Sequence, residues 1–597
     1  MKLTTLDWSI IAAYFLFNLG IGIYYARRAR GSTSEFFLSG RDVPWWLAGT
    51  SMVATTFAAD TPLAVTGFVA KGGIAGNWLW WNLVMSGILT VFLYARLWRR
   101  AGVMTDIEFT ELRYSGAPAA FLRGFRALYL GLPINCIIMG WVNLAMVKIL
   151  ENTLGLDKKQ ALLVVIGILI FTAFYTTISG LWGVLVTDLF QFVLKMGMVI
   201  VLAILAVRAV GGMDALKVKV AALDPSGGDQ SWRLAFFPSW DSAWMPAITL
   251  FSYLAVIWWA SWYPGAEPGG GGYVAQRIFS SKDERHGLLA TLWFNVAHYA
   301  LRPWPWILTA LASLVLYPEL KDKEAGYIQT LMDPGVFPVY LRGFMLAAFA
   351  AAYMSTIGTQ LNWGASYVIN DFYRRFLVRD SKERHYVIVS QIVTVCLMII
   401  SLIVTFYLES IGKAWKILLV TGAGTGTVLL LRWFWWRINA WSEVSAMVAA
   451  ATCSLFLQLN FKWDSDEPRQ FAYILLITVG FTTLVWLVTT FLTRPEPEEK
   501  LKDFYRRVHP QGPGWGRIAG AAATQTRPEG GSLGLQLVNW VLGCVLIYSL
   551  LFGIGYVIFG SRVRGIIWIG VGVLAAVLIS RNLDRTGWRS ASQEVTQ

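Results

Sequence analysis

Charged residues are scarce in this chain of 597 residues, because Asp, Glu, Lys and Arg together make up only 14% of it. Soluble globular proteins carry about 25% charged residues. Hydrophobic residues reach 56%, and the mean hydropathy is +0.53. This composition excludes a disordered chain and a large soluble enzyme.

Cysteine and catalytic motifs are scarce as well. The four cysteines are Cys136, Cys396, Cys453 and Cys544, and each lies inside an apolar run without a CxxC partner. We therefore expect neither a disulfide framework nor a zinc site. The sequence has no HExxH or Walker motif, so we do not predict an enzyme.

Long apolar runs are abundant. A transmembrane helix needs about 20 mostly apolar residues. The chain offers fifteen such runs: 6–26, 45–70, 77–98, 121–150, 161–179, 182–208, 243–276, 286–317, 336–373, 385–408, 412–436, 440–460, 470–493, 536–559 and 565–581. The predicted fold class is an all-α integral membrane protein that has the lipid bilayer as its solvent.

The basic residues behind the net charge of +14 are unevenly distributed along the chain. On a soluble chain this charge would suggest a nucleic-acid partner, but here 30 of the 50 Lys and Arg follow the odd-numbered runs. Basic loops stay on the cytoplasmic side. We predict a multi-pass membrane protein with its N-terminus outside, its C-terminus inside and no nucleic-acid partner. Segment 494–535 is rich in Pro, Gly and charge, so we interpret it as a solvated linker.

Run 45–70 contains an acid and a proline near its middle. Asp60 is costly at membrane depth, and Pro62 removes a backbone donor. The pattern predicts an interrupted helix with free carbonyls near Ala58 and Thr61, which would line a cavity or hold an ion. The alternative is a simple kink with Asp60 paired to a neighbour.

Run 243–276 is broken too. Residues 264–272 hold two Pro and several Gly, and no continuous helix survives that composition. An ordinary loop between two short spans is the alternative. The two broken runs are five spans apart, and such a pair is the sequence signature of a binding site between inverted repeats.

Two further runs carry polar groups. Ser355 and Thr359 share a helix face, with Ala352 one turn before, and their oxygens suit a hard cation. Close packing of small residues is the alternative. Asp188 could be an ion ligand or a carboxylate paired near the inner face.

Together these segments resemble the sodium:solute symporter family over about 6–492, and within it a bacterial subgroup of unknown substrate, which implies a location in the bacterial inner membrane. The resemblance rests on 36–41, 44–46, the Asp60 segment, 180–191, 276–277, 354–356 and 371–373. It implies a LeuT-like fold of two inverted five-helix repeats, with one extra N-terminal helix and about four extra C-terminal helices. The implied segments are 1–44 (extra helix), 45–208 and 243–438 (repeats), 209–242 (external loop), 439–493 (peripheral helices), 494–535 (cytoplasmic linker) and 536–597 (C-terminal helices).

The resemblance also implies sodium sites. The main site would use the carbonyls of Ala58, Thr61 and Ala352 and the hydroxyls of Ser355 and Thr356. A second sodium ion would bind at Asp188, Ser355 and Thr359, although Gly358 stands where such family members have a hydroxyl.

The substrate is expected beside the two breaks. Asn295, His298 and Arg302 share one helix face, and the other candidate binding or gating residues are Thr56, Asp60, Trp258, Trp259, Trp262, Tyr263 and Glu267. Arg302 needs a partner, which could be Glu267, Asp60 or a substrate carboxylate. Aromatic stacking would favour a sugar or polyol, whereas a free Arg302 would favour an organic or amino acid.

The function expected from these features is sodium-coupled import of a small organic solute by alternating access, with the monomer as the functional unit. Proton coupling through Asp60 or Asp188 is the rival within this class. An intramembrane enzyme for lipid-linked substrates is the rival from another class, and a sensor would need larger cytosolic segments than this chain offers.

Overall fold

The computed structural model describes residues 3–29, 31–224, 232–408, 411–521 and 531–585. Within these ranges the chain is almost entirely helical, and its only β-type contact is a bridge between Val43 and Ser281. Ten described helices are long and apolar enough to cross a membrane, and a bent pair of helices makes an eleventh span. The predicted all-α membrane architecture is confirmed.

The first part of the chain supplies the helices up to the long loop after residue 208. They are α1 (Thr5–Ala29), α2 (Thr33–Leu38), α3 (Trp45–Thr56), α4 (Thr61–Gly72), α5 (Trp78–Trp81), α6 (Val84–Leu89), η3 (Thr90–Tyr94), α7 (Ala95–Ala101), α8 (Phe109–Arg113), α9 (Gly116–Tyr129), η4 (Leu130–Ile134), α10 (Asn135–Leu154), α11 (Lys158–Val210) and α12 (Met213–Ala222).

The second part repeats this pattern of long and broken helices. It contains α13 (Ala247–Phe251), η6 (Ser252–Ile257), α14 (Trp258–Ala260), α15 (Gly272–Ser280), α16 (Glu284–Asn295), η7 (Val296–Leu301), α17 (Pro303–Leu316), α18 (Gly326–Met332), α19 (Arg342–Ser366), η10 (Tyr367–Leu377), α20 (Glu383–Tyr407), α21 (Ile411–Thr421) and α22 (Thr425–Phe434). The C-terminal part adds α23 (Ala440–Asn460), α24 (Pro468–Leu492), α25 (Glu498–Val508), α26 (Gly516–Ala521), α27 (Leu533–Ile558) and α28 (Arg562–Asp584).

Two predicted runs share one helix. Runs 161–179 and 182–208 both lie in α11, which is 53 residues long and changes direction at Gly180. This residue has φ 57° and ψ −155°, a conformation that only glycine adopts readily. A Cβ at this position would lie 2.8 Å from the carbonyl oxygen of Phe36. The two parts of α11 on either side of Gly180 match the two predicted runs, whereas runs 243–276, 286–317 and 412–436 are divided into shorter helices.

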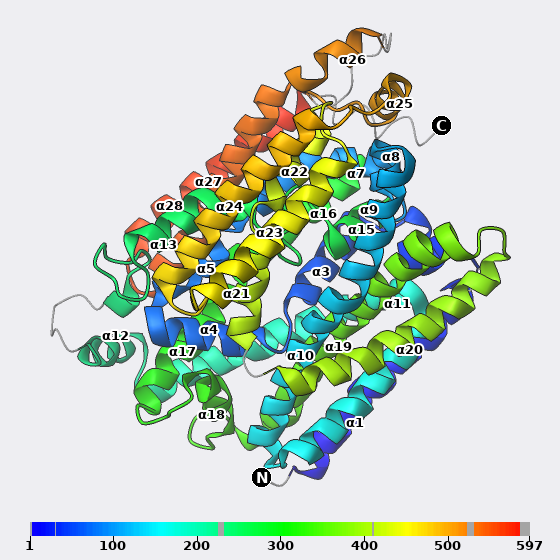
Figure 1. Cartoon of the computed structure of the whole chain (residues 1–597). Helices are drawn as coiled ribbons and strands as arrows, with labels where there is room; N and C mark the ends of the chain where they lie inside the picture. The colour runs from blue at the N-terminus through cyan, green and yellow to red at the C-terminus, as the bar shows by residue number, and fades with distance from the viewer. Residues whose placement is uncertain (1–2, 30, 225–231, 409–410, 522–530, 586–597) are drawn as a thin grey trace.

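The helices pack as a bundle with additions on opposite flanks (Figure 1). On one flank α1 packs against α11 and α19, and on the other α23 packs against α24 and α27 against α28. α11 also packs against α3 and α17. The broken helix α3–α4 is therefore enclosed by other helices, with α11 and α16 against α3 and α17 against α4.

Both interruptions expected from the sequence are present. α3 and α4 meet at an angle of 59°, and Pro62 lies in the first turn of α4. The second break separates α14 from α15, where residues 261–271 are not helical. Gly265, Gly269 and Gly270 have positive φ angles there, so the glycines shape this turn.

The predicted linker 494–535 is not simply solvated. Its described part forms α25, whose Leu501, Phe504 and Val508 are buried because their spacing places them on one helix face. Trp515 follows, and its indole N–H donates to the carbonyl of Trp433 at 2.7 Å. Parts of the predicted segments 1–44, 209–242, 494–535 and 536–597 (residues 1–2, 30, 225–231, 522–530 and 586–597) lie outside the described residues.

Candidate functional site

A cavity of about 90 Å³ lies between the two breaks. It is lined by residues from both broken helices and from the helices around them. The polar and aromatic lining residues are Thr55, Thr56, Asp60, Thr61, Phe68, Trp80, Trp141, Tyr263, Tyr273, His298, Tyr299, Arg302, Thr356, Gln360 and Trp415. Eight predicted site residues meet here: Thr56, Ala58, Asp60, Thr61, Tyr263, His298, Arg302 and Thr356.

Arg302 is the cation of this cavity, and its side chain is only 1% exposed. Its Nη1 donates to the Thr56 hydroxyl at 3.1 Å, and its Nη2 lies 3.4 Å from His298 Nε2. Its guanidinium also lies 4.9 Å from the ring centre of Trp306. Among the described residues no carboxylate lies within ion-pair distance of Arg302, and its Nε has no hydrogen-bond partner.

Asp60 is the acid of the same cavity. It lies between α3 and α4, is 1% exposed, and its Oδ1 has no hydrogen-bond partner in the described part of the chain. Asp60 and Arg302 therefore face one cavity without forming an ion pair. Buried charges are ordinarily paired, so both groups are available to a ligand.

Several predicted substrate residues do not reach the cavity. The indoles of Trp258 and Trp259 donate to backbone carbonyls of their own helical segment, one turn before. Trp262 lines a separate cavity of about 310 Å³ beside α21 and α22. Glu267 accepts the backbone N–H of Gly265 at 3.1 Å.

Asn295 also faces away from the main cavity. Its side-chain amide donates to the carbonyl of Thr291 at 2.8 Å, and together with Glu267 it lines a small separate hollow. His298 and Arg302 on the same helix do line the main cavity. The π-helical turn η7 lies between Asn295 and Arg302, so the regular helical spacing assumed from the sequence does not hold there.

Ser355 and Thr356, predicted for the main sodium site, lie on α19 opposite the end of α3. The Thr356 hydroxyl donates to the carbonyl of Thr55 at 2.8 Å and lies 3.2 Å from that of Ala352. The Ser355 hydroxyl donates to Asp188 at 2.6 Å. Because both hydroxyls act as hydrogen-bond donors in these contacts, the lone pairs of their oxygens remain available to a cation. The carbonyl of Ala58 accepts the N–H of Thr61 at 3.3 Å.

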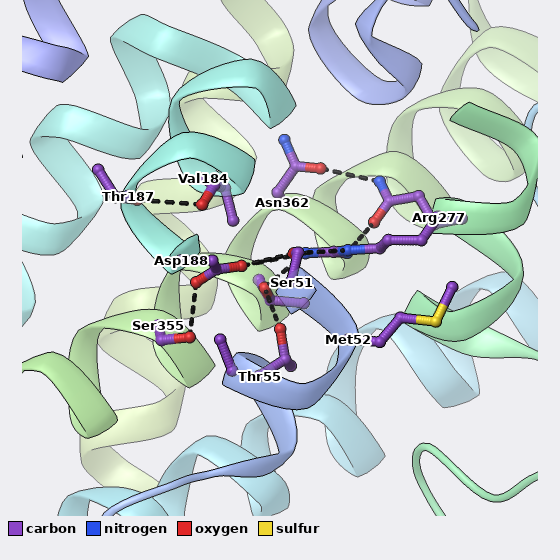
Figure 2. A network of polar contacts seen from close by, with 12 residues as sticks. Ser51, Met52, Thr55, Val184, Thr187, Asp188, Arg277, Ser355 and Asn362 are labelled. Atoms are coloured by element: carbon purple, nitrogen blue, oxygen red, sulfur yellow. Dashed lines mark hydrogen bonds and ion pairs between the residues drawn. The ribbon is translucent and has the colours of Figure 1, made fainter. Parts of the chain in front are cut away.

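The residues predicted for a second sodium ion meet in a dense polar network (Figure 2). Asp188 accepts hydrogen bonds from Ser51 and Ser355, and the guanidinium of Arg277 lies 4.0 Å away. Arg277 in turn donates to Thr359 at 2.8 Å. A protein cation therefore already lies among these residues.

Gly358 has a steric role beside this network. A Cβ at this position would lie 2.9 Å from Thr176 Cγ2, which is closer than side chains ordinarily pack. A hydroxyl-bearing residue would therefore need α11 and α19 to move apart. The close approach of the two helices accounts for the glycine.

Two buried cations beside the site were not singled out from the sequence as candidate site residues. Arg277 was assigned to the inner basic loops, but it is fully buried on α15. Lys195 lies in the apolar run of α11 and is 1% exposed. Its ammonium donates to the carbonyls of Ala54 at 2.8 Å and Phe57 at 3.3 Å. Lys195 follows Asp188 by seven residues, a spacing that places both side chains on one helix face and that could have indicated this lysine from the sequence.

A helical membrane bundle with two interrupted helices around a buried polar cavity defines a secondary transporter of the LeuT-like class. The family model "Sodium:solute symporter family" matches residues 36–450. The chain belongs to this family, as the resemblance indicated, and its family is one of transporters.

Curated relatives agree with this assignment. A sodium/glucose cotransporter of Vibrio parahaemolyticus is 24% identical over 518 residues, which cover 81% of this chain and 91% of the relative. A sodium/myo-inositol cotransporter 2 of Sus scrofa is 22% identical, over 83% of this chain and 77% of the relative. A solved Na⁺-coupled sialic acid symporter in a substrate-bound outward-open state has a TM-score of 0.67 at 20% identity, over 83% of this chain and 99% of the other. This structural likeness confirms the fold.

Proposed function

We propose that this protein uses a sodium gradient to import a small organic solute that carries a carboxylate, by alternating access. The observation that carries the proposal is Arg302, a buried arginine that lines the cavity without a carboxylate partner among the described residues. A buried cation without a counter-charge is costly. A substrate carboxylate would supply the counter-charge and would be held by two parallel N–H donors of the guanidinium.

Asp60 refines the proposed substrate class. Its carboxylate faces the same cavity and has a free Oδ1. A solute that presents an amino group to Asp60 and a carboxylate to Arg302 satisfies both charges, whereas a simple acid satisfies one. We therefore favour a zwitterion of the amino-acid type.

A sugar is the second candidate, because the curated relatives carry glucose and inositol in their names. The rings of Trp80, Tyr263 and Tyr299 line the cavity and offer faces on which a sugar could stack. A neutral sugar would leave Asp60 and Arg302 without a direct ion-pair partner, since the two groups interact only across the cavity. Burying charged groups without ion-pair partners is costly, which argues against a neutral sugar as the substrate.

We propose that sodium binds near the end of α3. Its ligands would be the hydroxyls of Ser355 and Thr356 and the carbonyls of Ala58, Thr61 and Ala352. Asp188 and Thr359 are candidates for a second ion. One sodium ion crossing 100 mV down a tenfold gradient releases about 3.7 kcal/mol, which could concentrate a neutral or zwitterionic solute roughly 500-fold. We further propose the two repeats 45–208 and 243–438, an N-terminus outside and a monomeric unit.

A ligand screen tests the substrate proposal. The purified protein is heated with amino acids, their decarboxylated amines, their deaminated acids and neutral sugars, each in sodium or choline chloride. We expect the strongest stabilisation by amino acids in sodium, weaker stabilisation by the acids and the amines, and none by sugars. Stabilisation by a neutral sugar, with no effect of any acid, would refute a carboxylate substrate.

A further inference from the structure

Lys195 binds the end of a broken membrane helix. Its ammonium donates to the carbonyls of Ala54 and Phe57, which belong to the last turn of α3 and the residue after it. These carbonyls lie where the helix breaks. The carbonyl of Phe57, at least, is therefore not needed as an acceptor for a hydrogen bond within α3. The C-terminal end of a helix carries partial negative charge, and a cation is the ligand that it favours.

The same helix end faces the hydroxyls proposed for sodium. Thr356 on α19 donates to the carbonyl of Thr55, which lies between Ala54 and Phe57 in the sequence. Lys195 from α11 and Thr356 from α19 therefore contact one turn of α3. A sodium ion that bound beside Thr356 at this turn would lie next to the lysine ammonium.

The charges around Lys195 make simultaneous occupancy unfavourable. On its own helix the nearest acid is Asp188, which interacts electrostatically with Lys195, but Asp188 also faces Arg277 at 4.0 Å. Arg302, at the start of α17, is a further cation that acts on Lys195. A sodium ion would add another positive charge to a region that already holds three cations, Lys195, Arg277 and Arg302, beside the two acids Asp188 and Asp60. Repulsion between like charges is strong where water is excluded.

We propose that the Lys195 ammonium is a tethered cation that takes the place of sodium at the carbonyls of the α3–α4 break and competes with it. Sodium binds at this turn only when the ammonium moves away from Ala54 and Phe57. Lys195 therefore weakens sodium binding and holds the broken helix in its ion-bound shape when sodium is absent. This inference rests on the proposed sodium coupling.

Neutral variants of Lys195 test the competition. Lys195→Met keeps the length of the side chain without its charge, and Lys195→Gln keeps an N–H donor if the methionine variant folds poorly. Lys195→Arg keeps a permanent charge. Sodium binding is followed by tryptophan fluorescence and by melting temperature, with choline chloride holding the ionic strength constant. Lys148→Met is the matched control, because Lys148 lies near Glu324 and not at the break.

We expect the neutral variants to reach half-saturation at a sodium concentration at least tenfold lower than the unmodified protein. Lys195→Arg and Lys148→Met should show no such gain. An unchanged sodium midpoint in the neutral variants would overturn the competition and leave sodium coupling intact. If neither the unmodified protein nor any neutral variant responds to sodium, both the competition and the sodium part of the proposed function are wrong.

Discussion

Replacing Arg302 by methionine removes the charge that is proposed to bind the substrate, while a long apolar side chain keeps filling part of its space. The guanidinium has five N–H donors. In the structure Nη1 binds Thr56 and Nη2 faces His298, whereas Nε has no partner within the described residues. Enough donors therefore remain to bind a carboxylate along one edge of the guanidinium.

The size of the effect follows from the burial of Arg302. Truncating one partner of a buried, hydrogen-bonded charge pair costs about 2–5 kcal/mol of binding free energy. At about 1.4 kcal/mol for each factor of ten, the Kd of a carboxylate ligand should rise roughly 30- to 5,000-fold. The Kd is measured in saturating sodium by tryptophan fluorescence or calorimetry.

A matched ligand pair separates this effect from a general distortion of the cavity. The amino acid and its decarboxylated amine are both titrated into the unmodified protein and into Arg302→Met. Only the amino acid should lose affinity, because the amine does not use Arg302. Equal changes for both ligands, or an unchanged Kd for the amino acid, would refute the role of Arg302 in carboxylate recognition.

Three other substitutions give distinct outcomes. Asp60→Asn should remove the preference for an amino acid over its deaminated acid in binding titrations, because the amino group loses its counter-charge; a retained preference would contradict the zwitterion model. Ser355→Ala combined with Thr356→Ala should abolish sodium-stimulated uptake in proteoliposomes, and unchanged uptake would show that sodium binds elsewhere. Glu443→Gln should lower the unfolding free energy by about 3–5 kcal/mol without changing ligand Kd, because Glu443 binds two buried arginines; an unchanged melting temperature would be inconsistent with this.

The positions of the helices were accessible from the sequence because membrane spans are encoded by composition over about 20 residues. The two breaks were also predictable, since Pro62 and the glycines after Pro264 are local signals. The boundary between runs 161–179 and 182–208 coincides with the kink at Gly180, but the sequence did not indicate that the two helices meet there without a loop. A single glycine with positive φ leaves little trace in a hydropathy pattern.

The site was predicted in part. Asp60, His298 and Arg302 were found because a polar residue within an apolar run is conspicuous. Trp258, Trp259 and Glu267 were equally suitable by residue type, but the two indoles donate to carbonyls of the preceding turn and Glu267 accepts the N–H of Gly265. Lys195 was not predicted because its proposed role depends on carbonyls at the end of another helix. The sequence around a residue does not show which other helix that residue contacts.

Sodium-driven accumulation in proteoliposomes tests the central claim most directly. Protein is reconstituted into vesicles, and uptake of the amino acid that binds best is measured with an inward sodium gradient and an inside-negative potential. The account predicts uphill accumulation that disappears when choline replaces sodium or when the sodium gradient is dissipated. Accumulation of equal size in choline, driven by a proton gradient alone, would contradict sodium coupling.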